Sequence, residues 1–199
     1  MRPFRNSAFG ASLLLAAGLT GCGSSGPLAP SPGTLSLAMK ATLPTGSTTV
    51  SAGSITFENL SVFGDVRPDD HDEHTETPVD LLAPAPFSTL SPPQGLYSAV
   101  RFTLDAASLD GTFQGTPLHA QFGEAFELHG IFVQAAKAKE VEPGEAAQFQ
   151  LAVDVTQWFD DAELGQADRE NGTILIDPTH NVTLARLLPF RIAASFALQ

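Results

Sequence analysis

Apolar and polar residues alternate along several stretches of this chain, and this pattern of period two restricts the fold more than any other feature. In the clearest stretch, Val100, Phe102 and Leu104 are separated by Arg101 and Thr103. Successive side chains of a β-strand point to opposite faces, so the pattern predicts strands with one buried and one polar face. It recurs in the segments 35–43, 55–57, 60–62, 126–132 and 149–155.

Two details of the alternation give sharper expectations. Its phase shifts by one residue between Phe57 and Leu60, which predicts a β-bulge or tight turn near Glu58-Asn59. In the segment 126–132, Phe126, Leu128 and Phe132 share one parity, which places Phe132 on the buried face and His129 on the less apolar opposite face.

Turn-forming residues separate the expected strands, and no amphipathic helix intervenes. The turns are expected at Pro44-Thr45-Gly46, Pro92-Pro93-Gln94-Gly95, Asp110-Gly111, Pro143-Gly144 and Asn171-Gly172. The sequence therefore predicts a mainly β chain, folded as an antiparallel β-sandwich of immunoglobulin-like or transthyretin-like type, with a barrel as the alternative. We expect residues 34–199 to form this single domain.

The C-terminal part follows a different spacing. Leu184, Leu187, Leu188 and Ile192 recur at intervals typical of a helix, which Asn181 or Thr183 would cap. Because Pro189 lacks an N–H group, we expect two helical turns, a kink and a second short helix. The alternative is a terminal strand over residues 191–198. A one-turn helix is expected over Asp160–Leu164. The preceding Trp158-Phe159 is expected to lie in the core or to anchor a loop.

The N-terminal segment has the features of a secretory signal peptide. Arg2 and Arg5 precede an apolar run, Ala8–Leu19, that is too short to span a bilayer. Residues 1–21 are therefore expected to be removed. Residues 23–33 are nearly all Gly, Ser and Pro, and we expect them to form a flexible tether behind Cys22.

The end of the apolar run, Leu19-Thr20-Gly21-Cys22, resembles the lipobox of bacterial lipoproteins. The resemblance implies cleavage before Cys22 and attachment of lipid to its thiol, which would anchor the chain to a membrane. Cys22 is the only cysteine, so no internal disulfide competes for it. Gly23 is not the aspartate that retains such proteins at the inner membrane, and this favours the outer membrane or cell surface.

A second resemblance covers the middle third of the chain. Val79-Asp80-Leu81-Leu82, Gly95-Leu96-Tyr97 and the strand 100–104 have a layout similar to that of a family of bacterial lipoprotein domains of unassigned function. The resemblance implies an extracytoplasmic β-sandwich and leaves the activity open.

The charge of the chain restricts its partners. The formal net charge is −12, and it becomes −14 when Arg2 and Arg5 leave with the signal peptide. Such a chain repels the phosphates of nucleic acid. We therefore expect no nucleic-acid partner, contact with the membrane through the lipid, and an envelope protein as a candidate partner. The oligomeric state and a periplasmic or surface-facing orientation stay open.

Residues 69–76, Asp-Asp-His-Asp-Glu-His-Thr-Glu, carry the sharpest candidate site. His71 and His74, with Asp70 and Asp72, offer the imidazole and carboxylate ligands that Zn²⁺ or Cu²⁺ takes in proteins. The alternative is a solvated acidic loop between two strands, which binds no metal specifically.

Other candidate groups favour no particular chemistry. We interpret His119, His129 and His180 as surface or rim histidines, and the acidic residues between 160 and 170 as a solvated loop. The motifs G-x-S-x-G, H-E-x-x-H and the P-loop are absent from the sequence. The sequence thus predicts a non-enzymatic envelope protein with a structural or binding role and no cofactor; a Zn- or Cu-binding lipoprotein is the alternative.

Overall fold

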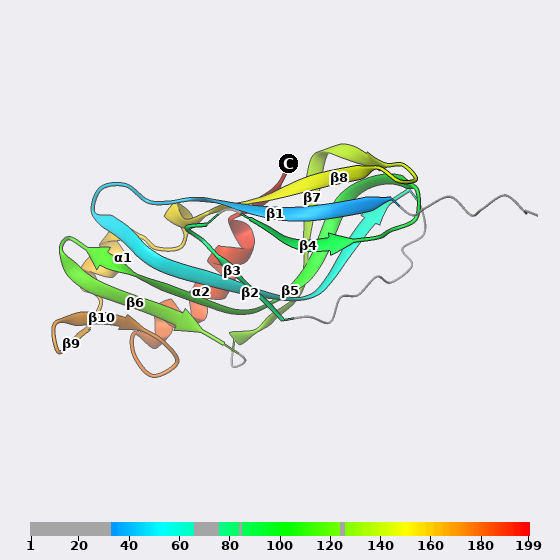
Figure 1. Cartoon of the computed structure of the whole chain (residues 1–199). Helices are drawn as coiled ribbons and strands as arrows, with labels where there is room; N and C mark the ends of the chain where they lie inside the picture. Colours follow the sequence, from blue (N-terminus) through cyan, green and yellow to red (C-terminus); the bar gives the residue numbers. More distant parts are fainter. Residues whose placement is uncertain (1–32, 66–75, 84, 124–125) are drawn as a thin grey trace, which may run out of the picture.

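The computed structural model describes residues 33–65, 76–83, 85–123 and 126–199, which form a mainly β chain with a C-terminal helix (Figure 1). The strands are β1 (Thr34–Thr42), β2 (Thr48–Gly64), β3 (Thr77–Asp80), β4 (Pro86–Leu90), β5 (Gly95–Phe113), β6 (Thr116–Phe122), β7 (Leu128–Val141), β8 (Ala146–Asp154), β9 (Arg169–Glu170), β10 (Thr173–Ile176) and β11 (Phe196–Leu198). The helices are η2 (Val155–Gln157), α1 (Asp161–Gln166) and α2 (Val182–Ala194). The expectation of a mainly β fold with a C-terminal helical segment is confirmed.

All the strands belong to one continuous, mixed sheet. Its order is β4-β1-β8-β11-β7-β5-β6-β10-β9, with β2 paired to β5 and β3 paired to β2. Three pairs are parallel, namely β1 with β8, β6 with β10 and β7 with β11. The expectation of a purely antiparallel sheet is therefore wrong, and no clear sandwich of two separate sheets is seen. The reason is β5, which pairs with β7 along its first half and with β6 along its second, and so joins the two groups of strands.

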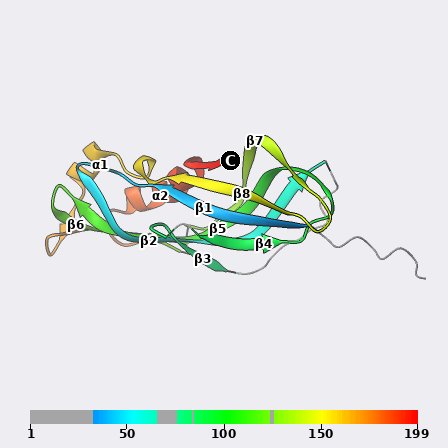
Figure 2. The same ribbon diagram turned by 45° about the horizontal axis from the view of Figure 1, so that its top comes forward.

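A single apolar core lies against this sheet. Strand β1 alternates as the sequence predicts, with Leu35, Leu37 and Met39 nearly inaccessible to solvent. Phenylalanines from the neighbouring strands β2 and β5 meet one from β4, at the far end of the strand order, in this core. The ring of Phe57 on β2 lies 5.1 Å from that of Phe87 on β4 and 5.0 Å from that of Phe102 on β5, measured between centroids. Figure 2 shows the strands and α2 gathered around this interior.

The shift in the alternation predicted for β2 is confirmed. A similar irregularity in β7 was not predicted from the sequence. The register of β2 against β5 shifts between Glu58 and Ser61, and Asn59 has a positive φ of 51°. In β7, Gly130 has a φ of 67°, and beyond it Phe132 is 56% exposed. The prediction that Phe132 lies on the buried face is therefore wrong.

Of two turns predicted from a glycine, one is found and the other is not. Asn171 and Gly172 join β9 to β10 with φ angles of 50° and 82°, as expected. Gly111 instead lies within β5, where a Cβ would be 1.9 Å from the carbonyl oxygen of Thr49. Glycine is needed at this position because β2 approaches closely, so the turn predicted at Asp110-Gly111 is wrong.

The C-terminal part contains one continuous helix followed by a short strand. Helix α2 continues through Pro189, so the predicted break there is wrong, and the predicted terminal strand survives only as β11. Burial of Ala185, Leu188 and Ile192 on one side of α2 offsets the hydrogen bond lost at the proline. Helix α1 forms close to the predicted position, and Trp158 is buried as expected.

Candidate functional site

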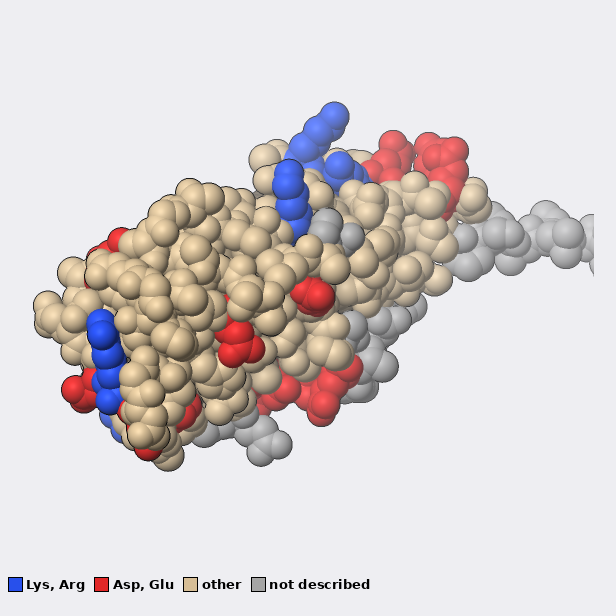
Figure 3. Space-filling model, turned by 60° about the vertical axis from the view of Figure 1, so that its left-hand side comes forward, with Lys and Arg blue, Asp and Glu red and all other residues tan. Residues whose placement is uncertain are grey.

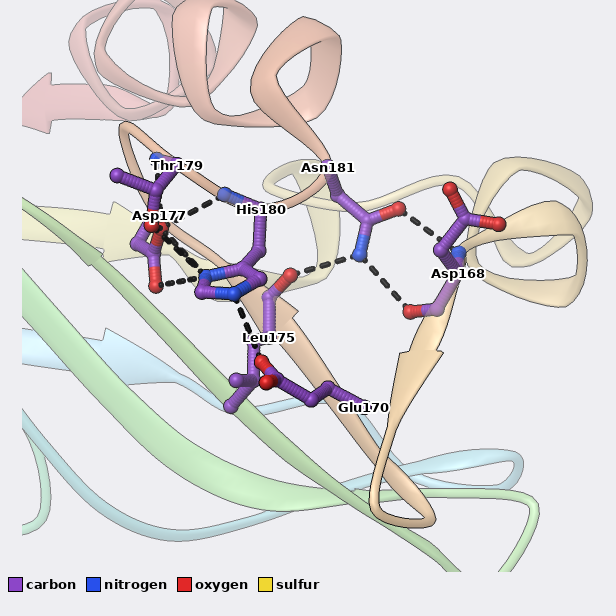
Figure 4. Close-up of polar contacts among 7 residues, drawn as sticks. All are labelled: Asp168, Glu170, Leu175, Asp177, Thr179, His180 and Asn181. Carbon is purple, nitrogen blue, oxygen red and sulfur yellow. Dashed lines mark hydrogen bonds and ion pairs between the residues drawn. The ribbon is translucent and has the colours of Figure 1, made fainter.

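The best-organised polar cluster of the described residues lies where β9, β10 and the start of α2 meet (Figure 4). It begins with the β9–β10 hairpin. A two-residue hairpin turn with positive φ at both positions favours Asn-Gly, and this chain has Asn171-Gly172 there. The turn sets Glu170, the last residue of β9, beside the residues that follow β10.

Asp177 organises the turn that follows β10. Its Oδ1 accepts hydrogen bonds from the backbone N–H of Thr179 at 2.7 Å, from the Thr179 hydroxyl at 2.7 Å and from the backbone N–H of His180 at 2.8 Å. A carboxylate that bonds the backbone two residues ahead is typical of an Asx-turn. This turn fixes the position of His180 immediately before α2.

The imidazole of His180 lies between two carboxylates. Its Nδ1 is 3.0 Å from each carboxylate oxygen of Asp177, and its Nε2 is 2.7 Å from Oε2 of Glu170. Both ring nitrogens therefore donate to acceptors that carry negative charge, and only the doubly protonated imidazolium does this. We call Glu170, Asp177 and His180 the His180 cluster.

The electrostatics of the cluster follow from these contacts. The hydrogen bond to Asp177, aided by the charges of Asp177 and Glu170, raises the pKa of His180 above its ordinary value despite some desolvation. Burial works to raise the pKa of the Asp177 carboxyl, but the hydrogen bonds from Thr179 and His180 outweigh it and hold that pKa below its usual range. Both pKa shifts favour the charged forms, imidazolium for His180 and carboxylate for Asp177.

Asn181 ties the same region together through backbone groups. Its side-chain oxygen accepts from the N–H of Asp168 at 2.8 Å, and its Nδ2 donates to the carbonyls of Asp168 at 3.0 Å and Leu175 at 2.7 Å. The residue has a φ of 45°, a left-handed conformation that asparagine tolerates better than most residues. It occupies the N-cap position of α2, as the sequence predicts, but its side chain does not cap the helix.

A cavity of about 180 Å³ adjoins the cluster. Its walls include His180, Glu170 and Asn181, together with Arg169 and Leu175. Because the cluster's hydrogen-bonding groups already bind one another, these side chains hold the walls in place. Such an arrangement suits a rigid support for α2 and the sheet edge better than proton transfer.

The acidic residues between 160 and 170 also have partners within the protein. Asp160 caps α1 by accepting from the N–H groups of Ala162 and Glu163, and Asp161 accepts from the Ser47 hydroxyl. Glu163 forms a two-point ion pair with Arg191 of α2, at 2.6 and 2.9 Å. The interpretation of this segment as a merely solvated loop is therefore incomplete, because Asp160 caps α1 and Glu163 holds α1 against α2.

Two further histidines lie near carboxylates at the surface. Nδ1 of His119 is 2.5 Å from Asp110, and Nδ1 of His129 is 3.3 Å from Glu127. The side chain of His129 is 72% exposed, and that of His119 is 37% exposed. Neither histidine joins the His180 cluster.

The residues that the sequence singled out as sites lie outside the described part of the chain. These are Cys22 and the candidate metal ligands Asp70, His71, Asp72 and His74. Within the described ranges, no three His, Cys, Asp or Glu side chains are grouped so that they could hold a metal ion. Sequence reasoning missed the His180 cluster, although Asn171-Gly172 and Asp177-Pro178 were visible as turn signals that bring its members together.

Comparisons with known proteins give no further identification. No protein-family model matches the chain, and neither a curated protein nor a solved structure similar to it was found. Of the helices in the described residues, none is long and apolar enough to cross a membrane.

Proposed function

We propose that this chain is a non-enzymatic, lipid-anchored protein of the cell envelope, whose β body has a structural or binding role. The anchor is Cys22, and residues 1–21 are the signal peptide that directs export. The lipobox-like sequence Leu19–Cys22, the single cysteine and the Gly-, Ser- and Pro-rich segment 23–33 support this assignment.

The proposal that the protein is not an enzyme depends on one observation: both ring nitrogens of His180 already have hydrogen-bond partners. A general base needs a free nitrogen within reach of a substrate proton. In the His180 cluster both nitrogens already bond to carboxylates, at 3.0 Å on one side and 2.7 Å on the other. His180, which is bonded on both ring nitrogens, thus supports the fold. This favours a scaffold or binding role for the protein.

The surface charge is consistent with an envelope protein that binds other proteins. Figure 3 shows a face on which uncharged residues predominate, with acidic and basic side chains scattered among them. Acidic residues outnumber basic ones by 22 to 10 in the whole chain. This balance disfavours a nucleic-acid partner and leaves an envelope protein as the expected one.

For the fold, we propose a sandwich-like body whose two layers are joined through β5 and β7. The stacking of Phe57 on β2 against Phe87 on β4, and the contact of Phe102 on β5 with Phe196 on β11, support two faces that pack against each other.

Metabolic labelling with a palmitate analogue tests the anchor. The wild-type chain should take up label and sediment with membranes, whereas a Cys22→Ser variant should do neither. An unlabelled wild-type chain in the soluble fraction would refute the anchor. Crosslinking followed by purification from envelope extract, with Cys22→Ser as the control, then identifies the partner of the anchored form.

The second candidate function is metal binding by Asp70, His71, Asp72 and His74, which the density of imidazoles and carboxylates in residues 69–76 favours. Calorimetric titration of the detergent-solubilised chain with Zn²⁺ and Cu²⁺ tests it. Binding should be lost in a His71→Ala/His74→Ala variant and kept in His129→Ala, which removes an exposed histidine elsewhere. Equal heats in all three proteins would reject the site.

A further inference from the structure

An exposed group of two aromatic rings and a cation lies on the outer face of β2, β5 and β7. The rings of Phe63 and Phe132 meet edge to face with centroids 5.7 Å apart, and the guanidinium of Arg101 lies 5.0 Å from the centre of the Phe63 ring. Phe132 is 56% exposed. We call Phe63, Arg101 and Phe132 the aromatic patch.

The strand register explains why these side chains share a face. Ser61, Arg101 and Phe132 lie opposite one another across the three strands, and Phe63 and Ala99 form the next outward row. The row between them, Val62, Val100 and Val133, is buried on the core side. Ser61 and Ala99, in the same rows as the patch residues, are each only 2% exposed.

The patch has the chemistry of a membrane interface. Aromatic rings are favoured at the level of lipid headgroups, and arginine binds phosphate with several donors. Within the described residues, no carboxylate lies within ion-pair distance of Arg101, so its remaining donors are available to an external anion. Asp65, Glu140 and Glu142 are exposed nearer the strand ends. Because these carboxylates are repelled by a strongly anionic surface, the patch is better suited to the phosphates of zwitterionic phospholipids.

The start of β1, where the expected tether joins the body, lies close enough to the patch for the anchoring bilayer to touch it. Thr34 bonds to Glu145 beside the β7–β8 turn, and Gly95 at the start of β5 pairs with Val141. β1 therefore starts at the end of the molecule where β5 starts, opposite to β9 and β10 (Figures 1 and 2). From Gly95, Arg101 is about 20 Å away along the strand. Residues 23–33 reach roughly 35 Å when extended, so lipid on Cys22 can enter a bilayer that the patch touches.

We propose that Phe63, Arg101 and Phe132 form a membrane-contact surface that rests on the phospholipid headgroups of the bilayer to which the chain is anchored. The proposal rests on the proposed lipid anchor and extends it, because it fixes which face of the body lies against the membrane.

Fluorescence of the full lipidated chain in phosphatidylcholine vesicles tests the proposal. A Phe132→Trp variant should show a blue shift and loss of emission when the vesicles contain brominated acyl chains. The matched control is Phe190→Trp, since Phe190 is 61% exposed on α2, and it should show neither change. Trp158 is buried and contributes a constant background. Adding Arg101→Glu to Phe132→Trp should lower the quenching, because a carboxylate repels the lipid phosphates that the guanidinium would bind.

The outcomes separate the patch from the anchor. If the chain fails to float with vesicles at all, the anchor is wrong. If it floats but the emission of the Phe132→Trp variant is unquenched, or Phe190→Trp is quenched equally, the membrane-contact surface is wrong and the anchor stands. A blue shift without quenching by brominated lipid would mean that a second copy or another protein covers the patch, and would also overturn the proposal.

Discussion

Nε2 of His180 lies 2.7 Å from Oε2 of Glu170, which joins the turn before α2 to the outermost strand β9. This contact closes a chain of bonds that begins at Asp177 and includes both ring nitrogens (Figure 4). Because one of its members is a histidine, the strength of the connection depends on pH in a range where most other contacts do not change.

A His180→Gln variant should melt a few degrees below the wild type near pH 6. The pKa of folded His180 is raised above its ordinary value of 6.5, so the stabilisation is complete below that value and is lost as the pH rises through the raised pKa. Thermal unfolding from pH 5 to 9 should show the two curves converging at alkaline pH.

Extending the same unfolding series to pH values below 3.8 reports on Asp177. Its pKa is lowered from 3.8, so its contribution is present above that value and disappears only as the pH falls through the lowered pKa. His129→Gln, at a largely exposed position, is the control and should leave the pH profile unchanged. A His180 imidazole that titrates at or below 6.5 by NMR would contradict this account.

An Asn181→Ala variant should lose about 3 kcal/mol of unfolding free energy, since three hydrogen bonds to backbone groups vanish and alanine is strained at a φ of 45°. Asn181→Gly loses the same bonds without the strain, so it should be about 1 kcal/mol more stable than the alanine variant. Urea titrations of the three proteins measure both differences. Equal stability of the two variants would show that the left-handed backbone costs nothing there.

Gly111→Ala should destabilise the protein by about 3 kcal/mol, because a Cβ would lie 1.9 Å from the Thr49 carbonyl oxygen and the strands β2 and β5 would have to separate. Gly123→Ala is the matched control, as no atom of the described residues lies within 4 Å of its Cβ position. Its stability should stay within about 0.5 kcal/mol of the wild type. A tolerated Gly111→Ala in the same denaturant titration would show that the two strands are not so close.

Ser61→Ala should stabilise the protein by about 1 kcal/mol, because the Ser61 hydroxyl is buried and has no hydrogen-bond partner among the described residues. Removing the hydroxyl relieves the cost of its desolvation. Ser54→Ala should have the opposite effect, because the Ser54 hydroxyl lies 2.9 Å from that of Ser108. Differential scanning calorimetry of both variants decides the sign.

Local patterns in the sequence predicted local structure well. The alternation in β1 and β8, the shift near Asn59 and the Asn171-Gly172 turn each depend on neighbouring residues, and each is found. Features set by distant partners were missed. Gly111 looked like a turn because the approach of Thr49 cannot be read locally, and helix α2 passes through Pro189 because its buried side packs on the core.

The same distinction applies to the candidate site. Glu170 and His180 are ten positions apart, and only the hairpin between them brings the two side chains together. The sequence instead drew attention to residues 69–76, where the ligand types are adjacent in the chain. The arrangement of Glu170, Asp177 and His180 in space could thus not be read from their spacing in the sequence.

Strand β11 lies between β7 and β8, where Leu198 pairs with Ala135 on one side and Leu151 on the other. A nascent chain that stops short of Phe196 therefore lacks the strand that links these two neighbours, and their edges stay open. The pairing that joins β7 to β8 through this strand can therefore form only after residues 196–198 have left the ribosome.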